Sequence, residues 1–276
     1  MALKNRILCS TGALIGRPNG RDYTLLSDCA ERLSCDGFEF LMYDTWYDKL
    51  EDVKRFMCSF SAPVPVFHCE KQIGDLISRD SEGDLDKALE LFTINCSLAS
   101  FIGAEKLVLH LWSGYDSDKN IAHNIECYKY LNDIARTNRL TLTVENVVCN
   151  RFDPMSHLIS LKKVYPDIQF TFDTKMAEFH GQLEALYDEK NSGIINNISH
   201  MHINDYKGGY MDWSKLNTLH IGDGQIDFDR LFKFIKEKNY CGDLTVEATS
   251  FDNNGVIDYD KLNKTFDIIR EKAAVC

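Results

Sequence analysis

Three features are missing from this sequence of 276 residues, and each absence narrows the class of protein. No run of about 18 apolar residues occurs, and a membrane-spanning helix requires that length, so we expect no membrane contact. The opening stretch, MALKNRILCSTGALIGRPNG, lacks the apolar core and cleavage site of a secretory signal, so we expect a cytoplasmic protein. The net charge of −11 argues against nucleic acid as a partner, because phosphate backbones attract basic surfaces.

The ten cysteines include no CxxC pair. They are scattered singly through apolar segments of a long chain, which favours reduced cysteines that act as small core residues over a disulfide framework. The positions are Cys9, Cys29, Cys35, Cys58, Cys69, Cys96, Cys127, Cys149, Cys241 and Cys276.

Eight short runs rich in strand-forming residues recur along the chain, each bounded by turn residues. Most are continuously apolar, which is typical of parallel strands buried on both faces. Helix-sized amphipathic segments follow them, clearest at 84–102, 121–138, 154–164, 228–238 and 259–272. The expected strands are 7–12, 37–42, 64–68, 106–111, 140–146, 169–173, 200–204 and 244–248.

This alternation predicts an α/β fold in which residues 1–276 form a single (β/α)8 TIM barrel. An open nucleotide-binding sheet is disfavoured, because Gly12, Gly16 and Gly20 lie in a polar loop that does not lead directly into a helix. No low-complexity tract or interdomain linker interrupts the pattern. We expect the loops 11–22, 112–119 and 205–227 to shape a substrate site.

Six consecutive strands end in an ionisable residue, and barrel enzymes place their chemistry at this end of the strands. Each residue taken alone has an ordinary structural role, such as capping a helix. Together, three imidazoles and three carboxylates with few basic partners would be costly to crowd unless a cation neutralised them. Mixed ligands of this kind favour Zn²⁺, Mn²⁺, Co²⁺ or Fe²⁺ over Ca²⁺ or Mg²⁺. The residues are His68, His110, Glu145, Asp173, His202 and Glu247.

Four segments resemble the xylose isomerase-like superfamily, which holds sugar isomerases, sugar and sugar-phosphate epimerases, inosose-processing enzymes and endonuclease IV. They are TVEN at 143–146, FDT at 172–174, HIND at 202–205 and IGDGQIDFDRLFKFIKEKNYCGDLTVE at 221–247, and the resemblance covers almost the whole chain. It implies one divalent metal, Zn²⁺ or Mn²⁺ with Co²⁺ as an alternative, held by Glu145, Asp173, His202 and Glu247. The remaining pair, His68 and His110, is similar to the ligands of a second metal in endonuclease IV, or faces the substrate.

The resemblance implies a metal-dependent isomerase or epimerase that acts on a small sugar, sugar phosphate or polyol ketone. Proton transfer by Glu145 and Glu247 would proceed through an enediolate. Arg151, His180 and Lys207 are the predicted substrate-binding residues, and Arg17 is a further cation that could receive a phosphate. The partner would be a small carbohydrate; a homo-oligomer is one alternative that the sequence leaves open.

Two alternatives remain. An endonuclease IV-like phosphodiesterase (AP endonuclease family 2) would use the two further histidines with Glu145 as a second metal site. The third metal of endonuclease IV is not expected here, because Met176, Leu216 and Thr218 stand where its ligands would be. The other alternative is a sugar-binding barrel without catalysis, against which the retained glutamate pair counts.

Overall fold

Eight parallel strands close into a barrel in the computed structural model, which describes residues 5–188 and 192–274. Each strand pairs with its sequence neighbours, and β1 pairs with β8 to complete the ring. The predicted (β/α)8 fold is therefore confirmed. The strands are β1 Ile7–Ser10, β2 Gly37–Leu41, β3 Val66–His68, β4 Lys106–Leu109, β5 Thr141–Glu145, β6 Gln169–Asp173, β7 Ile198–His202 and β8 Asp243–Val246.

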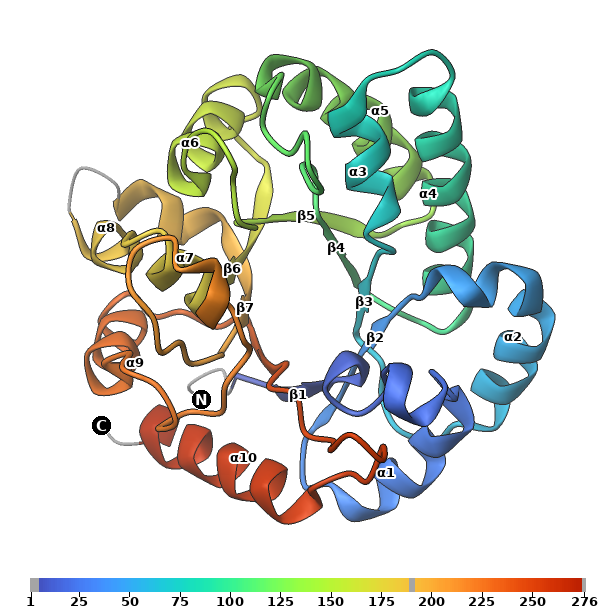
Figure 1. The fold of residues 1–276 in the computed structure, drawn as a ribbon, viewed down its shortest axis with the longest axis vertical. Coiled ribbons are helices and arrows are strands. Elements are labelled where there is room, and N and C mark those ends of the chain that lie inside the picture. Colours follow the sequence, from blue (N-terminus) through green and yellow to red (C-terminus); the bar gives the residue numbers. More distant parts are fainter. Residues whose placement is uncertain (1–4, 189–191, 275–276) are drawn as a thin grey trace.

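Helices form an outer ring around the strands (Figure 1). They are α1 Leu26–Arg32, α2 Leu50–Ser59, α3 Gln72–Arg79, α4 Asp84–Phe101, α5 Ile121–Thr137, α6 Pro154–Val164, α7 Thr174–Phe179, α8 Leu183–Tyr187, α9 Phe228–Glu237 and α10 Tyr259–Ala274. Short 3-10 turns are η1 Thr11–Ala13, η2 Arg17–Asn19, η3 Tyr23–Leu25, η4 Asp44–Lys49, η5 Ser192–Asn197 and η6 Trp213–Lys215. Within the described ranges, none of these helices combines the length and the apolar character that crossing a membrane requires.

Several predicted strand limits were wrong by a few residues. The strand expected at 64–68 begins at Val66, and the preceding Pro65 has no N–H to donate to a sheet. The strand expected at 200–204 runs two residues earlier, as Ile198–His202, because Asn204 and Asp205 already make loop and side-chain bonds. The residues expected as a loop at 11–22 include the turns η1 and η2.

Successive residues of each strand point alternately toward the helices and into the barrel. The large apolar core lies between strands and helices, and most of the ionisable strand residues lie inside the barrel. Outward-facing residues such as Phe40 and Phe67 pack with the helices in the main core. A small separate cluster consists of Leu8, Val66 and Val108. Leu8 on β1 and Val66 on β3 lie on strands that are not neighbours, so these two side chains meet inside the barrel.

The nine cysteines in the described residues are free, as predicted, but Cys58 and Cys241 are exposed and Cys35 is partly exposed, so these three are not the core residues that we expected. Cys276 lies outside the described residues.

An ion-pair cluster closes the amino-terminal end of the barrel. Asp243, the first residue of β8, accepts hydrogen bonds from Nε of Arg6 at 2.7 Å and from Nζ of Lys106 at 2.6 Å. Burial raises the pKa of Asp243, but these two bonds outweigh burial and the pKa lies below its usual value. This end therefore stabilises the barrel and leaves the opposite rim for chemistry.

Asp118 ties the loop after β4 to the loop after β5. Its Oδ1 accepts from the backbone N–H groups of Asn150 and Arg151, both at 3.0 Å, and its Oδ2 accepts from Phe152 N at 2.8 Å. Nε2 of His157 on α6 lies 3.0 Å from Oδ2. Asp118, His157 and nearby Cys149 are residue types that could together hold a metal ion. The carboxylate of Asp118 is already bonded by the four donors above, which favours a structural role.

Asp205, the last residue of HIND, folds the long loop after β7. Its Oδ2 accepts from the backbone N–H groups of Gly222 and Gly224, both at 2.9 Å, and its Oδ1 accepts from Ile226 N at 3.1 Å. A Cβ at Gly224 would lie 2.3 Å from Oδ1 of Asp205, so only glycine fits there. The HIND aspartate and the GDG turn are thus one structural unit.

Candidate metal centre and active site

A cavity of about 390 Å³ opens at the carboxyl ends of the strands. Its lining combines four of the six predicted strand-end residues with charged residues that the sequence analysis did not single out. The lining includes His68, His110, Glu145, Glu247, Arg21, Asp44, Glu70, Lys71, Lys175, Met176 and Thr218. This volume suits a small polar molecule.

Four predicted ligands converge at this cavity, and two of them, Glu145 and Glu247, line it. Nδ1 of His202 lies 3.0 Å from Oε1 of Glu145, 3.2 Å from Oε2 of Glu247 and 3.9 Å from Oδ2 of Asp173. One ligand atom from each of the four residues lies within 4.8 Å of all the others. The strand ends bring them together because neighbouring parallel strands finish at one rim.

The other two predicted residues gather on the second oxygen of Glu145. Nε2 of His110 lies 2.7 Å from Oε2 of Glu145, and Nε2 of His68 lies 3.5 Å from the same atom. Glu145 therefore lies between the two groups, with Oε1 toward His202 and Oε2 toward His68 and His110. The two groups share one bridging carboxylate.

The donors and charges of this site fit a divalent cation. Nε2 of His110 lies 2.7 Å from the buried atom Oε2 of Glu145, but not in the geometry of a regular hydrogen bond, so this oxygen keeps a lone pair for a cation. Burial raises the pKa of Asp173 to about 6, with help from Glu145 and Glu247 and against the charge of Lys175. Burial lowers the pKa of His110 to about 4 although Glu145 opposes this, so near neutral pH the imidazole keeps a lone pair for a metal.

A positive charge on His202 offsets the negative charge of the carboxylates in the site. Burial opposes ionisation of Glu247, but the charge of His202 outweighs burial and lowers the pKa of Glu247 to about 2. The pKa of His202 is in turn raised well above its usual value, since Glu247, Glu39 and Glu145 overcome the effect of burial. A bound cation would replace this proton charge among the carboxylates.

Two asparagines hold the ligands in place, one from TVEN and one from HIND. Oδ1 of Asn146 accepts from the backbone N of Asp173 at 2.6 Å, which joins β5 to β6. Nδ2 of Asn204 donates to Oδ2 of Asp173 at 3.1 Å and to Oε2 of Glu247 at 3.2 Å. Such outer bonds fix the direction in which ligand oxygens point.

Sequence reasoning missed two buried charged residues here. Glu39 on β2 lies against His200 and His202, and Lys175 directly follows the Asp173–Thr174 pair on β6 and α7. Nζ of Lys175 donates to Oγ1 of Thr218 at 2.9 Å and lies 4.0 Å from Oδ2 of Asp173. The available signal for Glu39 was a charged residue inside an apolar run, GFEFL, whereas Lys175 follows the polar pair Asp173–Thr174 and had no comparable signal.

The three predicted substrate-binding residues do not line this cavity in the described structure. Arg151 is exposed, and its backbone is held by Asp118; Lys207 is exposed on the loop after β7. Buried His180 accepts a hydrogen bond at Nε2 from the backbone N of Cys149. Arg17, also exposed, lines a neighbouring groove instead. The cations along the cavity are Arg21, Lys71 and Lys175.

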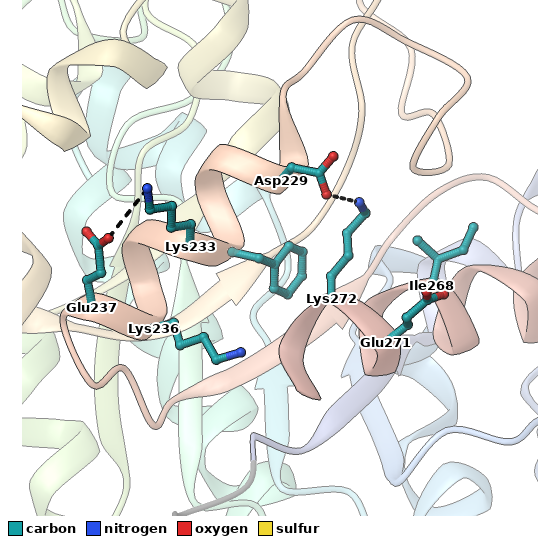
Figure 2. Close-up of a pocket in the computed structure, with 8 residues that line it drawn as sticks. Asp229, Lys233, Lys236, Glu237, Ile268, Glu271 and Lys272 are labelled. Atoms are coloured by element: carbon teal, nitrogen blue, oxygen red, sulfur yellow. Dashed lines mark hydrogen bonds and ion pairs between the residues drawn. The ribbon is translucent and has the colours of Figure 1, made fainter. Parts of the chain in front are cut away.

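A larger hollow of about 660 Å³ lies between α9 and α10 on the outer ring (Figure 2). Four of its charged side chains form two pairs: Nζ of Lys233 lies 4.0 Å from Oε1 of Glu237, and Lys272 bonds Asp229. Phe232 and Ile268 add apolar lining. Because the ligand types gather at the strand ends, we place the candidate active site there and not in this groove.

The chain belongs to the family described as xylose isomerase-like TIM barrel, whose sequence model matches residues 28–270. An uncharacterized protein of Methanocaldococcus jannaschii is 27% identical over 206 residues, which cover 69% of this chain and 68% of that protein. The structure of D-allulose 3-epimerase from a Methylomonas species has a TM-score of 0.71 at 17% identity, over 99% of this chain and 100% of the other. The IolI protein with a bound zinc atom has a TM-score of 0.74 at 13% identity, over 98% of both chains.

Proposed function

We propose that this protein is a divalent-metal-dependent isomerase or epimerase of a small sugar, sugar phosphate or polyol ketone. The observation that carries the proposal is the convergence of Glu145 and Glu247 on Nδ1 of His202 beside Asp173, under a cavity of about 390 Å³. Membership of the xylose isomerase-like family supports it. The similar fold of an epimerase of D-allulose and of a zinc-bound protein gives further support.

Glu145, Asp173, His202 and Glu247 would hold the metal, and we propose Zn²⁺ or Mn²⁺, with Co²⁺ as an alternative. When bound, the ion would polarise the substrate carbonyl and stabilise negative charge that develops on its oxygen. The three carboxylates beside Nδ1 of His202 support the same cation-binding role.

The glutamates would move the proton. Glu145 ends β5 and Glu247 follows β8, so their carboxylates enter the site from different arcs of the barrel. One carboxylate would remove the proton from the carbon beside the carbonyl and leave an enediolate, and the other would return a proton. Removal from one side and return on the other inverts a carbon centre.

Lys175 is our proposed substrate contact, in preference to Arg151, His180 and Lys207. Its ammonium has three N–H donors, of which one bonds Thr218. Lys175 is 6% exposed and lines the cavity, where a charge-assisted bond to a substrate oxygen gains strength from burial.

Proton exchange in deuterated water tests the proposal. Ketoses, ketose phosphates and inososes would be incubated with the protein and Mn²⁺, Co²⁺ or Zn²⁺, and deuterium incorporation would be followed by NMR. We expect exchange at the carbon beside the carbonyl with the wild type, none with Glu145→Gln or Glu247→Gln, and wild-type exchange with the exposed control Glu237→Gln. Exchange that survives in both glutamate variants would refute the two-base scheme.

One observation favours a second candidate function, hydrolysis of a phosphodiester. His68 and His110 gather on Oε2 of Glu145, as a second metal position would require. The net charge of −11 and the contact between Lys175 and Thr218, at a position where endonuclease IV has a ligand to its third metal, count against it. Two bound metal ions per chain together with cleavage of an abasic DNA duplex would establish this function in place of the first.

A further inference from the structure

Glu39 lies inside the barrel on β2 and is 0% exposed. Its Oε2 atom lies 2.7 Å from Nε2 of His200 and 3.0 Å from Nε2 of His202. Nε2 of His200 is also 3.2 Å from Oγ1 of Thr245, which anchors that imidazole to β8. The carboxylate of Glu39 therefore contacts His202 at Nε2, whereas Glu145, Glu247 and Asp173 lie toward Nδ1 of the same ring.

Hydrogen-bond chemistry then decides which nitrogen of His202 is available. The imidazole of a histidine that ligates a metal is neutral and carries one N–H, and an ionised carboxylate only accepts. Oε2 of Glu39 lies within hydrogen-bond distance of the Nε2 atoms of both His200 and His202, so the carboxylate accepts from the two imidazoles. Nε2 of His202 must then keep the hydrogen, and the lone pair is left on Nδ1, which faces Glu145, Glu247 and Asp173.

We infer that Glu39 is a positioning residue that fixes the tautomer and the ring orientation of His202, and so sets the metal affinity of the site. This inference rests on the proposed function, because it requires the metal. An outer carboxylate that accepts from a ligating histidine also makes the imidazole a stronger donor to the metal, and its loss typically weakens metal affinity by about 10- to 100-fold. Glu39 itself is not among the residues that line the cavity, so it acts through His202.

The first experiment titrates metal-free protein with Co²⁺ in competition with a chelating dye. We expect Glu39→Gln to bind Co²⁺ about 10- to 100-fold more weakly than the wild type and to change the visible spectrum of bound Co²⁺, which reports ligand geometry. Thr171→Val is the matched control: it removes the 2.6 Å bond to Thr143 in the same barrel interior without touching His202, and should keep wild-type affinity.

The second measurement needs no variant and covers the case in which Glu39→Gln does not fold. Nitrogen-15 NMR of the zinc-loaded wild type should show His202 protonated at Nε2 and free of hydrogen at Nδ1. Equal Co²⁺ affinity in Glu39→Gln and wild type, or the opposite tautomer, would overturn the inference about Glu39. If the wild type binds none of Co²⁺, Mn²⁺ and Zn²⁺, the proposed function itself fails.

Discussion

Oε1 of Glu145 lies 3.0 Å from Nδ1 of His202, although a whole strand, β6, separates the two in the barrel. Contact across a strand is available only on the concave inner side of a closed sheet. The pair therefore shows how closure brings acid and imidazole groups from distant parts of the chain to one point.

Removal of a ligand should abolish tight metal binding. We expect Asp173→Asn to weaken Zn²⁺ binding by more than about 100-fold, since a lost ligand should cost more than a lost outer partner. His68→Asn should lower only the affinity for any second equivalent of metal, because His68 contacts the Oε2 side of Glu145. Calorimetric titration of both variants gives the comparison, and an unchanged first equivalent in Asp173→Asn would contradict the ligand assignment.

Metal should also stabilise the fold. At a free Zn²⁺ concentration 100-fold above its dissociation constant, the free energy of unfolding should rise by about 2.7 kcal/mol, because the ion binds the folded chain. Urea unfolding with and without a chelator measures the difference. The same gain in Asp173→Asn would mean that the ion binds elsewhere.

Lys175 should matter to activity more than the exposed lysine of the following loop. We expect Lys175→Met to lower kcat/KM by about 100-fold, the size of a lost charge-assisted bond in a buried site, with metal affinity retained. Lys207→Met, the matched control, should behave as the wild type because Lys207 is exposed and does not line the cavity. Steady-state kinetics on a substrate found by proton exchange would decide, and the reverse order of effects would restore the sequence-based prediction for Lys207.

The ion pairs of Asp243 predict how stability depends on pH. Because the folded pKa of Asp243 is depressed, its contribution is present above the unfolded value of about 3.9 and is lost as the pH falls through the folded pKa. Asp243→Asn should cost about 2 kcal/mol at pH 7, less than a fully buried pair, because Arg6 is partly exposed. Urea unfolding should show that Asp243→Asn lowers the free energy of unfolding less at pH 3 than at pH 7. The surface control Asp229→Asn should change the free energy of unfolding little at either pH.

Asp118 should keep the loop after β4 and the loop after β5 in fixed conformations. In Asp118→Asn the amide nitrogen faces backbone donors, so we expect a loss of about 2 kcal/mol and faster hydrogen exchange at Asn150, Arg151 and Phe152. Asp116→Asn, in the same loop, should leave this exchange unchanged because the Asp116 carboxylate pairs with Lys119, at 3.4 Å, and not with residues 150–152. Mass spectrometry of exchanged peptides separates the two outcomes.

The ring of strands could be predicted because parallel strands buried on both faces are apolar throughout, and an ionisable residue at the end of such a run stands out. His110 and Glu145 were found in this way, and the structure brings them within 2.7 Å of each other. Their roles as ligand and base stay predictions.

Side-chain direction could not be predicted in the same way. Glu39 lies in the middle of its strand, where only the pairing register decides whether a residue points into the barrel or toward the helices. Arg151 and His180 were placed near the correct rim, but backbone bonds to Asp118 and from Cys149 direct the two segments elsewhere. These are long-range contacts that no local pattern encodes.

The four bonds of Asp118 also bear on how this barrel can be re-engineered. A graft that replaces residues 112–119 alone would leave three backbone N–H groups of residues 150–152 without their acceptor. A graft that replaces residues 150–152 alone could leave the carboxylate of Asp118 without its donors. The two segments are therefore one exchangeable cassette, and libraries that recombine loops of related barrels should transfer them together.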